Sequence, residues 1–293
     1  MHKIAVIPGD GIGKEVIPAA LEVIDAAASG VLEKTEFPWG CDFHVRTGRM
    51  MDADGFDQLQ KFEAIFLGAI GDPRVPDHVS VWELILPLRQ RFDQYVNLRP
   101  MRLLPGVTSP LAGRTTKDID MVCVRENSEG EYGGLGGRMH VGTPHEVAEQ
   151  TGIFTRRGIE RVAKYAFEVA AKRPRRKLAS ATKSNALQHS MVLWDKVVEE
   201  VAKDYPQVEW RKYHVDALAA RMVTDPGSID GNLRSGFRLA LGATPRLPET
   251  AAPRSVRMSP NRFEATITSM LPGSVTIRAA SASTWYFRHS TCG

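Results

Sequence analysis

Short apolar runs alternate with longer amphipathic segments along the first 230 residues of the chain. Residues 3–7 are a short apolar run rich in β-branched side chains, which is typical of a buried strand. The predicted strands occupy residues 3–7, 64–70, 120–124, 177–183 and 208–216. Strands that alternate with amphipathic helices predict an α/β fold with a mainly parallel sheet.

The segments between these runs have apolar residues at helical spacing. Pro18 is tolerable in the first of them only if it lies in the first turn, and Pro87 is expected to kink the second. Thr155 has the residue type and position of an N-cap for the third, which carries an apolar stripe. The predicted helices cover residues 14–28, 79–92, 155–173 and 190–205.

The regular pattern ends after Asp230. Residues 231–293 contain scattered arginine, proline and serine, have no sustained period, and include neither lysine nor aspartate. Two interpretations stay open for this segment. It is an extended tail, or it is not the natural continuation of the gene, because of a frame error or a fusion.

The composition is ordinary for a soluble globular protein, with 43% hydrophobic and 25% charged residues among 293. This length has room for two domains. No run of 18 apolar residues occurs, and the N-terminus enters a strand directly, so neither a transmembrane helix nor a signal peptide is expected. Three scattered cysteines predict neither a disulfide framework nor a zinc site, and the expected location is cytoplasmic.

The basic isoelectric point of about 9.0 comes from the end of the chain. Residues 232–293 contain eight of the 38 basic residues but only two of the 34 acidic ones, Glu249 and Glu264. The rest of the chain is therefore slightly acidic, and it lacks the basic patches interleaved with aromatic residues that nucleic-acid binders show. We expect no nucleic-acid partner and no membrane partner.

Charged and polar residues follow several of the predicted strands. In α/β proteins, ligands bind beyond the carboxyl ends of the strands, so these residues are candidates for a shared site. Taken singly, each has a plainer interpretation, because arginines and lysines at such places are more often solvated and an aspartate there is more often a helix cap. The candidates are Arg125 and Tyr132, Lys183 and Asn185, and Asp216.

Three arginines that converge on one cleft would bind an anion with two carboxylates through forked, charge-assisted contacts. Arg89, Arg99 and Arg125 are the three candidates, and Tyr132 and Lys183 are side chains that could move protons beside them. No histidine has a partner at ligand-like spacing, and we expect the histidines to be structural or exposed. The four considered are His140, His145, His189 and His214.

The segment PGDGIG, residues 8–13, is similar to a dinucleotide-binding fingerprint but does not match it. Gly9, Gly11 and Gly13 alternate, whereas the fingerprint requires G-x-G-x-x-G. A pyrophosphate bound at the helix N-terminus is therefore not predicted from this motif. The alternative is a tight turn from strand to helix that needs the backbone freedom of glycine.

Five segments occur in a recognisable order: IAVIPGDGIGKEV, FDQYVNLRP, VRENSEGEY, SATKSN and DALAARMV. Together they resemble the metal-dependent β-decarboxylating dehydrogenases, which include isocitrate, 3-isopropylmalate, tartrate and D-malate dehydrogenases. The resemblance covers roughly residues 1–230. Residues 75–113 are most similar to the tartrate/D-malate branch.

The resemblance implies a two-domain, isopropylmalate-dehydrogenase-like fold and a homodimer whose sites are shared between subunits. Residues 1–98 would be the N-terminal part of a cofactor-side domain, and residues 99–230 the substrate and dimerisation domain. Residues 231–293 would be an atypical tail that stands in place of the remainder of the cofactor-side domain.

The resemblance also implies roles for individual residues. Arg89, Arg99 and Arg125 would bind the carboxylates of a 2-hydroxy diacid, and Tyr132 and Lys183 would be the acid/base pair. Glu126, Glu129 and Glu131 receive no direct role and are expected to be solvated or to support the site indirectly.

The remaining implied roles concern the cofactors and the choice of substrate. Asp216 would be a ligand of Mg²⁺ or Mn²⁺ and, like Lys183, would come from the neighbouring subunit. Asn185 would lie near the nicotinamide of NAD and Ile12 near the cofactor. Trp82 lies where members of the family contact the third substituent of the substrate. The bulky ring leaves little space for an isopropyl group.

This sequence departs from the family after Asp230. Two further metal-ligand aspartates and a loop of the HGSAP type, which wraps the adenosine of NAD, are absent. Two hypotheses follow: an NAD- and metal-dependent tartrate/D-malate-type dehydrogenase, with decarboxylation possible, or a defective homologue that binds a diacid or forms dimers without turnover. 3-Isopropylmalate dehydrogenase is the alternative within the enzyme class.

Overall fold

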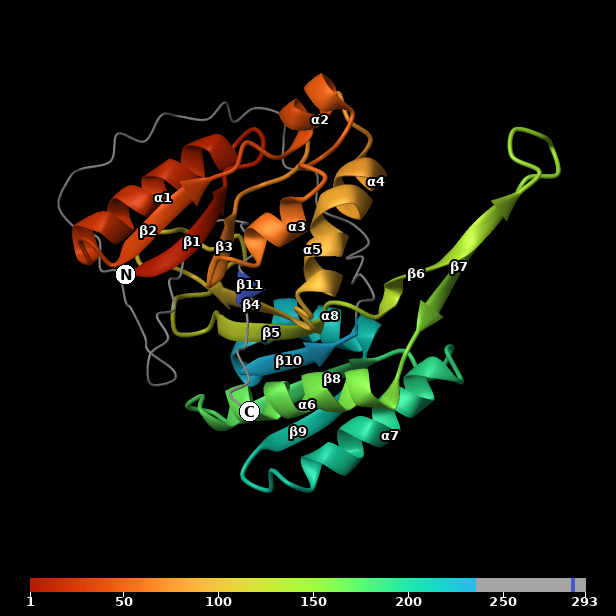
Figure 1. The fold of residues 1–293 in the computed structure, drawn as a ribbon. Helices are drawn as coiled ribbons and strands as arrows, with labels where there is room; N and C mark the ends of the chain where they lie inside the picture. Colours follow the sequence, from red (N-terminus) through yellow and green to blue (C-terminus); the bar gives the residue numbers. More distant parts are fainter. Residues whose placement is uncertain (236–285, 288–293) are drawn as a thin grey trace.

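The computed structural model describes residues 1–235 and 286–287 (Figure 1). It contains two β-sheets and a separate two-stranded hairpin. The strand order is β11-β3-β1-β2 in the first sheet and β4-β5-β10-β8-β9 in the second. Every strand pair except β11–β3 and β4–β5 is parallel within these two sheets, so the predicted α/β fold with a mainly parallel sheet is confirmed.

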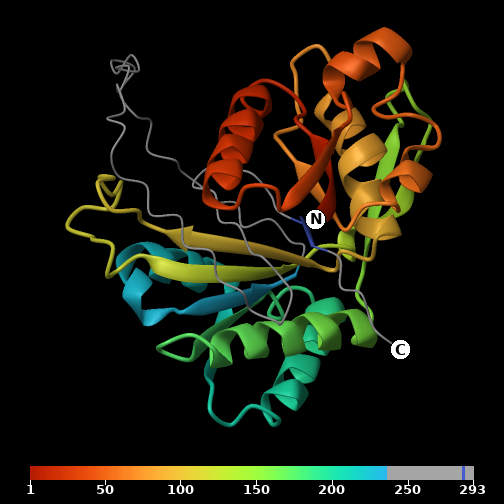
Figure 2. The same cartoon turned by 60° about the vertical axis from the view of Figure 1, so that its left-hand side comes forward.

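The first sheet is the centre of the lobe drawn in red and orange (Figure 2). Its strands are β1 (His2–Ile7), β2 (Leu32–Glu36), β3 (Ala64–Leu67) and β11 (Tyr286–Phe287), and its neighbouring helices are α1 (Gly13–Ala27), α2 (Cys41–Thr47) and α3 (Gly55–Leu59). Buried apolar side chains hold this lobe together. They include Ile7, Trp39, Leu59, Leu84 and Leu88.

The second sheet carries the larger apolar core. Its strands are β4 (Val96–Arg102), β5 (Asp120–Glu126), β8 (Lys177–Thr182), β9 (Glu209–His214) and β10 (Gly231–Arg234). One face packs against α6 (Arg156–Ala171) and α7 (Ser190–Ala202), while α8 (Val215–Thr224) packs near β8 and β9 (Figure 1). Phe167 and Trp194 are fully buried in this core.

Strand β10 lies beyond the point where the regular pattern was expected to end. It pairs in parallel with both β5 and β8, so it is an inner strand of the second sheet. The expectation that regular structure ends at Asp230 is therefore wrong by four residues, because four residues are too few to show a period. The remainder of the predicted tail lies outside the described residues, apart from Ser235 and β11.

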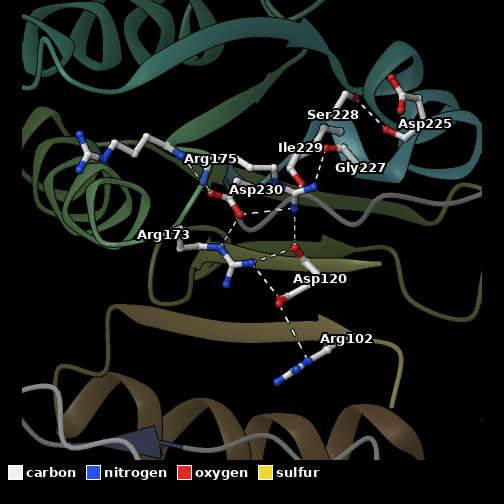
Figure 3. A network of polar contacts seen from close by, with 10 residues as sticks. Arg102, Asp120, Arg173, Arg175, Asp225, Gly227, Ser228, Ile229 and Asp230 are labelled. Atoms are coloured by element: carbon white, nitrogen blue, oxygen red, sulfur yellow. Dashed lines mark hydrogen bonds and ion pairs between the residues drawn. The ribbon is translucent and has the colours of Figure 1, made fainter. Parts of the chain in front are cut away.

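A network of polar contacts surrounds the buried Asp230 carboxylate, just before β10 (Figure 3). The Asp230 carboxylate is 1% exposed and accepts hydrogen bonds from Arg173 Nε at 2.8 Å and from the backbone N–H groups of Arg175 and Arg176 at 3.1 Å. Arg173 and Arg175 also donate to Asp120 at the start of β5. The α6–β8 connection, β5 and β10 are thus joined at one point.

The two prolines in predicted helices lie where local rules alone do not place them. Pro18 is in the second turn of α1, so the expectation of a first-turn position is wrong, and the Lys14 carbonyl loses its usual i+4 donor. Pro87 lies in the first turn of α5 (Leu86–Arg91), which directly follows a π-helical segment at Val81–Ile85 that continues α4 (Asp77–Ser80). The π-helical turn accommodates the missing proline N–H.

Helix α6 follows its sequence pattern closely. The Thr155 hydroxyl accepts a hydrogen bond from the Gly158 backbone N–H at 2.9 Å, which confirms the predicted N-cap. The predicted apolar stripe is buried except for Val169, which is half-buried, and Phe167 is a buried member that the prediction omitted.

A long hairpin leaves the body of the protein (Figure 1). It consists of β6 (Gly130–Met139) and β7 (Val147–Ile153), and its strands pair antiparallel with an irregularity between Gly130 and Leu135. The sequence analysis missed it because its glycine-rich, exposed strands show no apolar alternation. In the described part of the chain, no helix has the length and apolar character to cross a membrane.

Candidate functional site

One face of the second sheet carries polar side chains from β4, β5 and β10. Residues that are register partners on neighbouring strands project from the same face of a sheet. Arg99 is the partner of Cys123, and Asn97 and Arg234 are the partners of Arg125. The side chains between them in the sequence face the helices α6 and α7. These are Leu98, Val124 and Leu233.

Arg99, Arg125 and Arg234 all lie close enough to the Cys123 thiol for their charges to affect its pKa. Burial raises its pKa, while the positive charges of Arg234, Arg125 and Arg99 all act to lower it. Two of the three arginines predicted to share a cleft, Arg99 and Arg125, therefore lie on one face and act on one small region. Arg234 belongs to the same group, although the sequence analysis did not single it out.

Arg125 and Tyr132 are in direct contact. Arg125 is only 7% exposed, and its Nη2 donates a hydrogen bond of 2.5 Å to the Tyr132 hydroxyl. The Arg125 guanidinium carbon also lies 5.0 Å from the centre of the Tyr132 ring. The turn between β5 and β6 thus brings a buried guanidinium and a phenol hydroxyl together.

Glu126 builds the turn that makes this contact possible. It is buried, and its carboxylate accepts hydrogen bonds from the backbone N–H and hydroxyl of Ser128, both at 2.9 Å, and from the backbone N–H of Glu129 at 2.8 Å. Burial raises its pKa in spite of these bonds. The expectation of a solvated side chain is wrong for Glu126. Its carboxylate is held inside the turn because it accepts hydrogen bonds from backbone N–H groups that have no backbone acceptor there.

Glu129 ties the same turn to α6. Its carboxylate accepts hydrogen bonds from the backbone N–H of Thr155 at 2.9 Å and from the Thr155 hydroxyl at 2.6 Å. A carboxylate is favoured at this N-terminal end of a helix by the helix dipole. Glu131 is half-buried at the base of the hairpin, where its backbone carbonyl accepts from Gln150 Nε2 at 2.9 Å. The carboxylates of Glu126 and Glu129 therefore fix the position of the turn.

Arg89 and Trp82 come from the helical run beside this turn. Gln90 Nε2 donates to the Tyr132 carbonyl at 2.9 Å, so α5 is attached to the start of β6 next to Arg89. Arg89 is half-buried, and its side chain is not free of interactions. Trp82 is 40% exposed, and a side chain on Gly134 would approach its ring to 3.2 Å. The run thus lies along the base of β6.

Lys183 and Asp216 form an ion pair within one chain. Lys183 follows β8 directly, and Asp216 is in the first turn of α8. The hydrogen bond from Lys183 lowers the pKa of Asp216. Asn185, two residues after Lys183, is exposed. The pair is a unit of its own, built on β8 and α8, while Arg125 and Tyr132 belong to β5 and β6.

The loop PGDGIG is a tight turn from β1 to α1. Gly9 and Gly11 have positive φ values of 75° and 48°, and a Cβ on Gly9 would come within 2.2 Å of the Ala69 carbonyl oxygen. The predicted need for glycine is therefore confirmed at these two positions. Ile12 is 59% exposed at the tip, and a cavity of about 500 Å³ beside the loop is lined in part by Asp10 and Lys14.

The family model for isocitrate/isopropylmalate dehydrogenase matches residues 3–233, which include every element described above except β11, the first residue of β1 and the last residue of β10. The chain belongs to the isocitrate/isopropylmalate dehydrogenase family. It is thus a member of a family of oxidoreductases, as the resemblance implied, and it has the predicted α/β fold with a mainly parallel sheet.

Two relatives in this family are nearly half identical to the chain. The D-malate dehydrogenase [decarboxylating] of Escherichia coli strain K12 is 47% identical over 275 residues, covering 89% of this chain and 76% of that protein. A probable tartrate dehydrogenase/decarboxylase, TtuC', of Agrobacterium vitis is 46% identical over 275 residues, covering 90% of this chain and 77% of that protein.

Two solved structures are similar to this chain in fold. The isocitrate dehydrogenase of Methylococcus capsulatus has a TM-score of 0.72 and 31% identity, over 80% of this chain and 67% of that one. The TT0538 protein of Thermus thermophilus has a TM-score of 0.68 and 32% identity, over 80% of this chain. This chain spans only 45% of the length of TT0538.

The described residues offer few ligands for a divalent metal ion. Among them, no group of three or more His, Cys, Asp or Glu side chains is arranged to hold a metal ion. Asp216, the predicted ligand, is paired with Lys183. Because Mg²⁺ and Mn²⁺ need several oxygen ligands, the described residues do not form a complete metal site by themselves.

Sequence reasoning missed three polar residues on the arginine-bearing face: Asn97, Asn232 and Arg234. Asn97 and Asn232 are each 2% exposed, and Asn232 is the partner of Cys123 in the register of β10 and β5. The alternation in GNLR, with polar Asn232 and Arg234 on either side of Leu233, is the signal that could have revealed them.

Proposed function

We propose that this protein is an NAD-dependent dehydrogenase of the tartrate/D-malate type, which oxidises a small 2-hydroxy diacid and can release CO₂ from the product. The observation that carries the proposal is the placement of Arg99 and Arg125 on one sheet face with the Tyr132 hydroxyl bonded to Arg125. Membership of the dehydrogenase family and the tartrate and D-malate relatives support the choice of substrate class.

The arginines select the substrate by charge. Arg89, Arg99 and Arg125 each offer several N–H donors, so a molecule with two carboxylates can be held at both ends. Because Arg125 is buried, its contact with a carboxylate is shielded from water and contributes more than an exposed pair would. A neutral hydroxy compound has no carboxylate and therefore makes no charge-assisted hydrogen bonds with these arginines.

Lys183 and Tyr132 move the protons. Lys183 takes the proton of the 2-hydroxyl as the C2–H bond breaks and the carbonyl forms. When bound, NAD⁺ supplies the acceptor for the hydride that leaves C2. Loss of CO₂ from the resulting β-keto acid leaves an enolate, and Tyr132, oriented by Arg125, donates the proton that completes the product.

A second copy of the chain completes the site in this proposal. Lys183 and Asp216 would reach the arginines of the partner subunit, and their ion pair keeps them together as they do so. Exposed apolar side chains support a homodimer, since large apolar residues in water often mark a contact surface. Those on the hairpin are Leu135, Met139, Val141 and Val147.

The cofactors would be NAD and Mg²⁺ or Mn²⁺. Ile12, exposed beside the glycine turn, and Asn185, exposed after β8, are the described residues that would contact NAD. Asp216 would contribute to a metal site only with further oxygen ligands, which the described residues do not supply.

This shortage of metal ligands supports one alternative, a homologue that binds a diacid or forms dimers without turnover. Purified protein with NAD⁺, Mn²⁺ and D-malate or tartrate is expected to show reduction of NAD⁺ at 340 nm, with slower reduction for 3-isopropylmalate. A clear preference for 3-isopropylmalate would make it an isopropylmalate dehydrogenase. Binding of D-malate by calorimetry without any reduction of NAD⁺ would support the inactive homologue.

Trp82 provides a separate test of substrate size. Trp82→Ala is expected to raise kcat/KM for 3-isopropylmalate relative to D-malate by at least about tenfold, because the ring occupies space near the base of β6 that an isopropyl group needs. Glu83→Ala, an exposed neighbour in the same π-helical segment, is the matched control and should leave this ratio unchanged. An unchanged ratio in the Trp82 variant would remove Trp82 from the choice of substrate.

A further inference from the structure

Arg234 is the last residue of β10, the inner strand between β5 and β8. Its register partner on β5 is Arg125, so the two side chains leave neighbouring strands on the same face, with backbones roughly 4.8 Å apart. Both act on the Cys123 thiol, which places their charges near one another in space as well as in register.

The Arg234 side chain makes a hydrogen bond with the Cys123 thiol. Its Nε is buried and has no hydrogen-bond partner among residues 1–235, and the Nδ2 of Asn232 on the same face is in the same condition. Arg234 also lines a small recess with Thr182 and Lys183. The positive charge of Lys183 is neutralised by its ion pair with Asp216.

Two guanidinium groups on neighbouring strands repel each other, and an anion bound between them lowers this repulsion. A carboxylate has about four lone-pair positions on its two oxygens and can accept hydrogen bonds from two guanidinium forks at once. A buried hydrogen-bond donor without a partner, such as Arg234 Nε, is unfavourable. An oxyanion bound between the two guanidinium groups would lower their repulsion and also accept a hydrogen bond from this donor.

We infer that Arg234 is a further anion-binding residue, and that Arg125 and Arg234 together hold one carboxylate of the substrate. The inference rests on the proposed function for the identity of the ligand, a 2-hydroxy diacid. The chemistry of the pair itself requires only a small oxyanion, which could also be a free inorganic anion.

The test is calorimetric titration of the full-length protein with D-malate and, separately, with sulfate at low ionic strength. Arg234→Met is expected to weaken the binding of both anions by at least about tenfold. Arg211→Met is the matched control, because Arg211 lies on the same sheet face two strands away, on β9, and is paired with Glu209. The control should stay within about twofold of the unmodified protein.

Each outcome separates the inference from the proposed function. Equal binding of D-malate by the Arg234→Met variant and the unmodified protein would overturn the inference and leave the proposed function standing. Sulfate binding that is lost in Arg234→Met, with no D-malate binding by the unmodified protein, would retain the anion site and refute the proposed substrate. If the unmodified protein binds neither anion, the inference fails.

A second variant guards against loss of folding. Arg234→Lys keeps the charge but removes the fork, and is expected to bind both anions more weakly than the unmodified protein and more tightly than Arg234→Met. If Arg234→Met is unfolded by circular dichroism, unaltered binding by Arg234→Lys would overturn the inference.

Discussion

Replacing Lys183 by arginine is expected to lower kcat for D-malate by about 10²–10⁴-fold with little change in substrate binding, because general-base catalysis contributes a factor of this size. Arginine keeps the positive charge and can keep the ion pair with Asp216, but it does not exchange its proton at neutral pH. The measurement is initial-rate kinetics of NAD⁺ reduction, together with calorimetric binding of D-malate.

Lys203→Arg is the matched control for this prediction. Lys203 follows α7 and is exposed, so the same substitution there should leave kcat unaltered. If Lys183→Arg retains a tenth or more of the original kcat, Lys183 acts as a fixed positive charge and the base must be another group. Equal losses in kcat and in D-malate affinity would indicate a role in binding.

Asp230→Asn is expected to lower the free energy of unfolding by about 3–5 kcal/mol. The Asp230 carboxylate is buried between Arg173 and Arg175, and it accepts the N–H of Arg176, whose φ is +51° (Figure 3). An asparagine would leave two cations without their buried counter-charge and turn an amide N–H₂ toward donors. Urea unfolding followed by circular dichroism measures the change.

Asp225→Asn is the control for the same substitution. Asp225 lies five residues earlier and is exposed, with a 3.4 Å ion pair to Arg221. Exposed pairs of this kind contribute little, so a loss below about 1 kcal/mol is expected. Equal losses in the two variants would show that the network around Asp230 contributes nothing special to stability.

These predictions differ in how far the sequence alone supports them. Lys183 is recognisable from SATKSN, because the motif follows an apolar run and belongs to an ordered set. Asp230 is not, since a single aspartate in a loop has no pattern, and its importance comes from Arg173 and Arg175, more than 50 positions away in the chain. Contacts between such distant positions arise only when strands are paired.

The acidic residues of VRENSEGEY show the same limit. A cluster of charges predicts a polar site, and Arg125 and Tyr132 do meet there. The burial of Glu126 and the contact between Glu129 and the start of α6 could not be predicted, because both depend on where α6 packs against β5. Local composition does not contain that information.

The amino-acid sequence by itself determined the elements whose pattern is local: the apolar strands β1, β5 and β8, the amphipathic helix α6 with its Thr155 cap, and the glycine turn after β1. Tertiary structure alone decided that β10 lies between β5 and β8 and that Arg234 therefore faces the same side as Arg125. The physical reason is that periodicity and capping act over a few residues, whereas strand order and register are set by pairing segments about 100 residues apart.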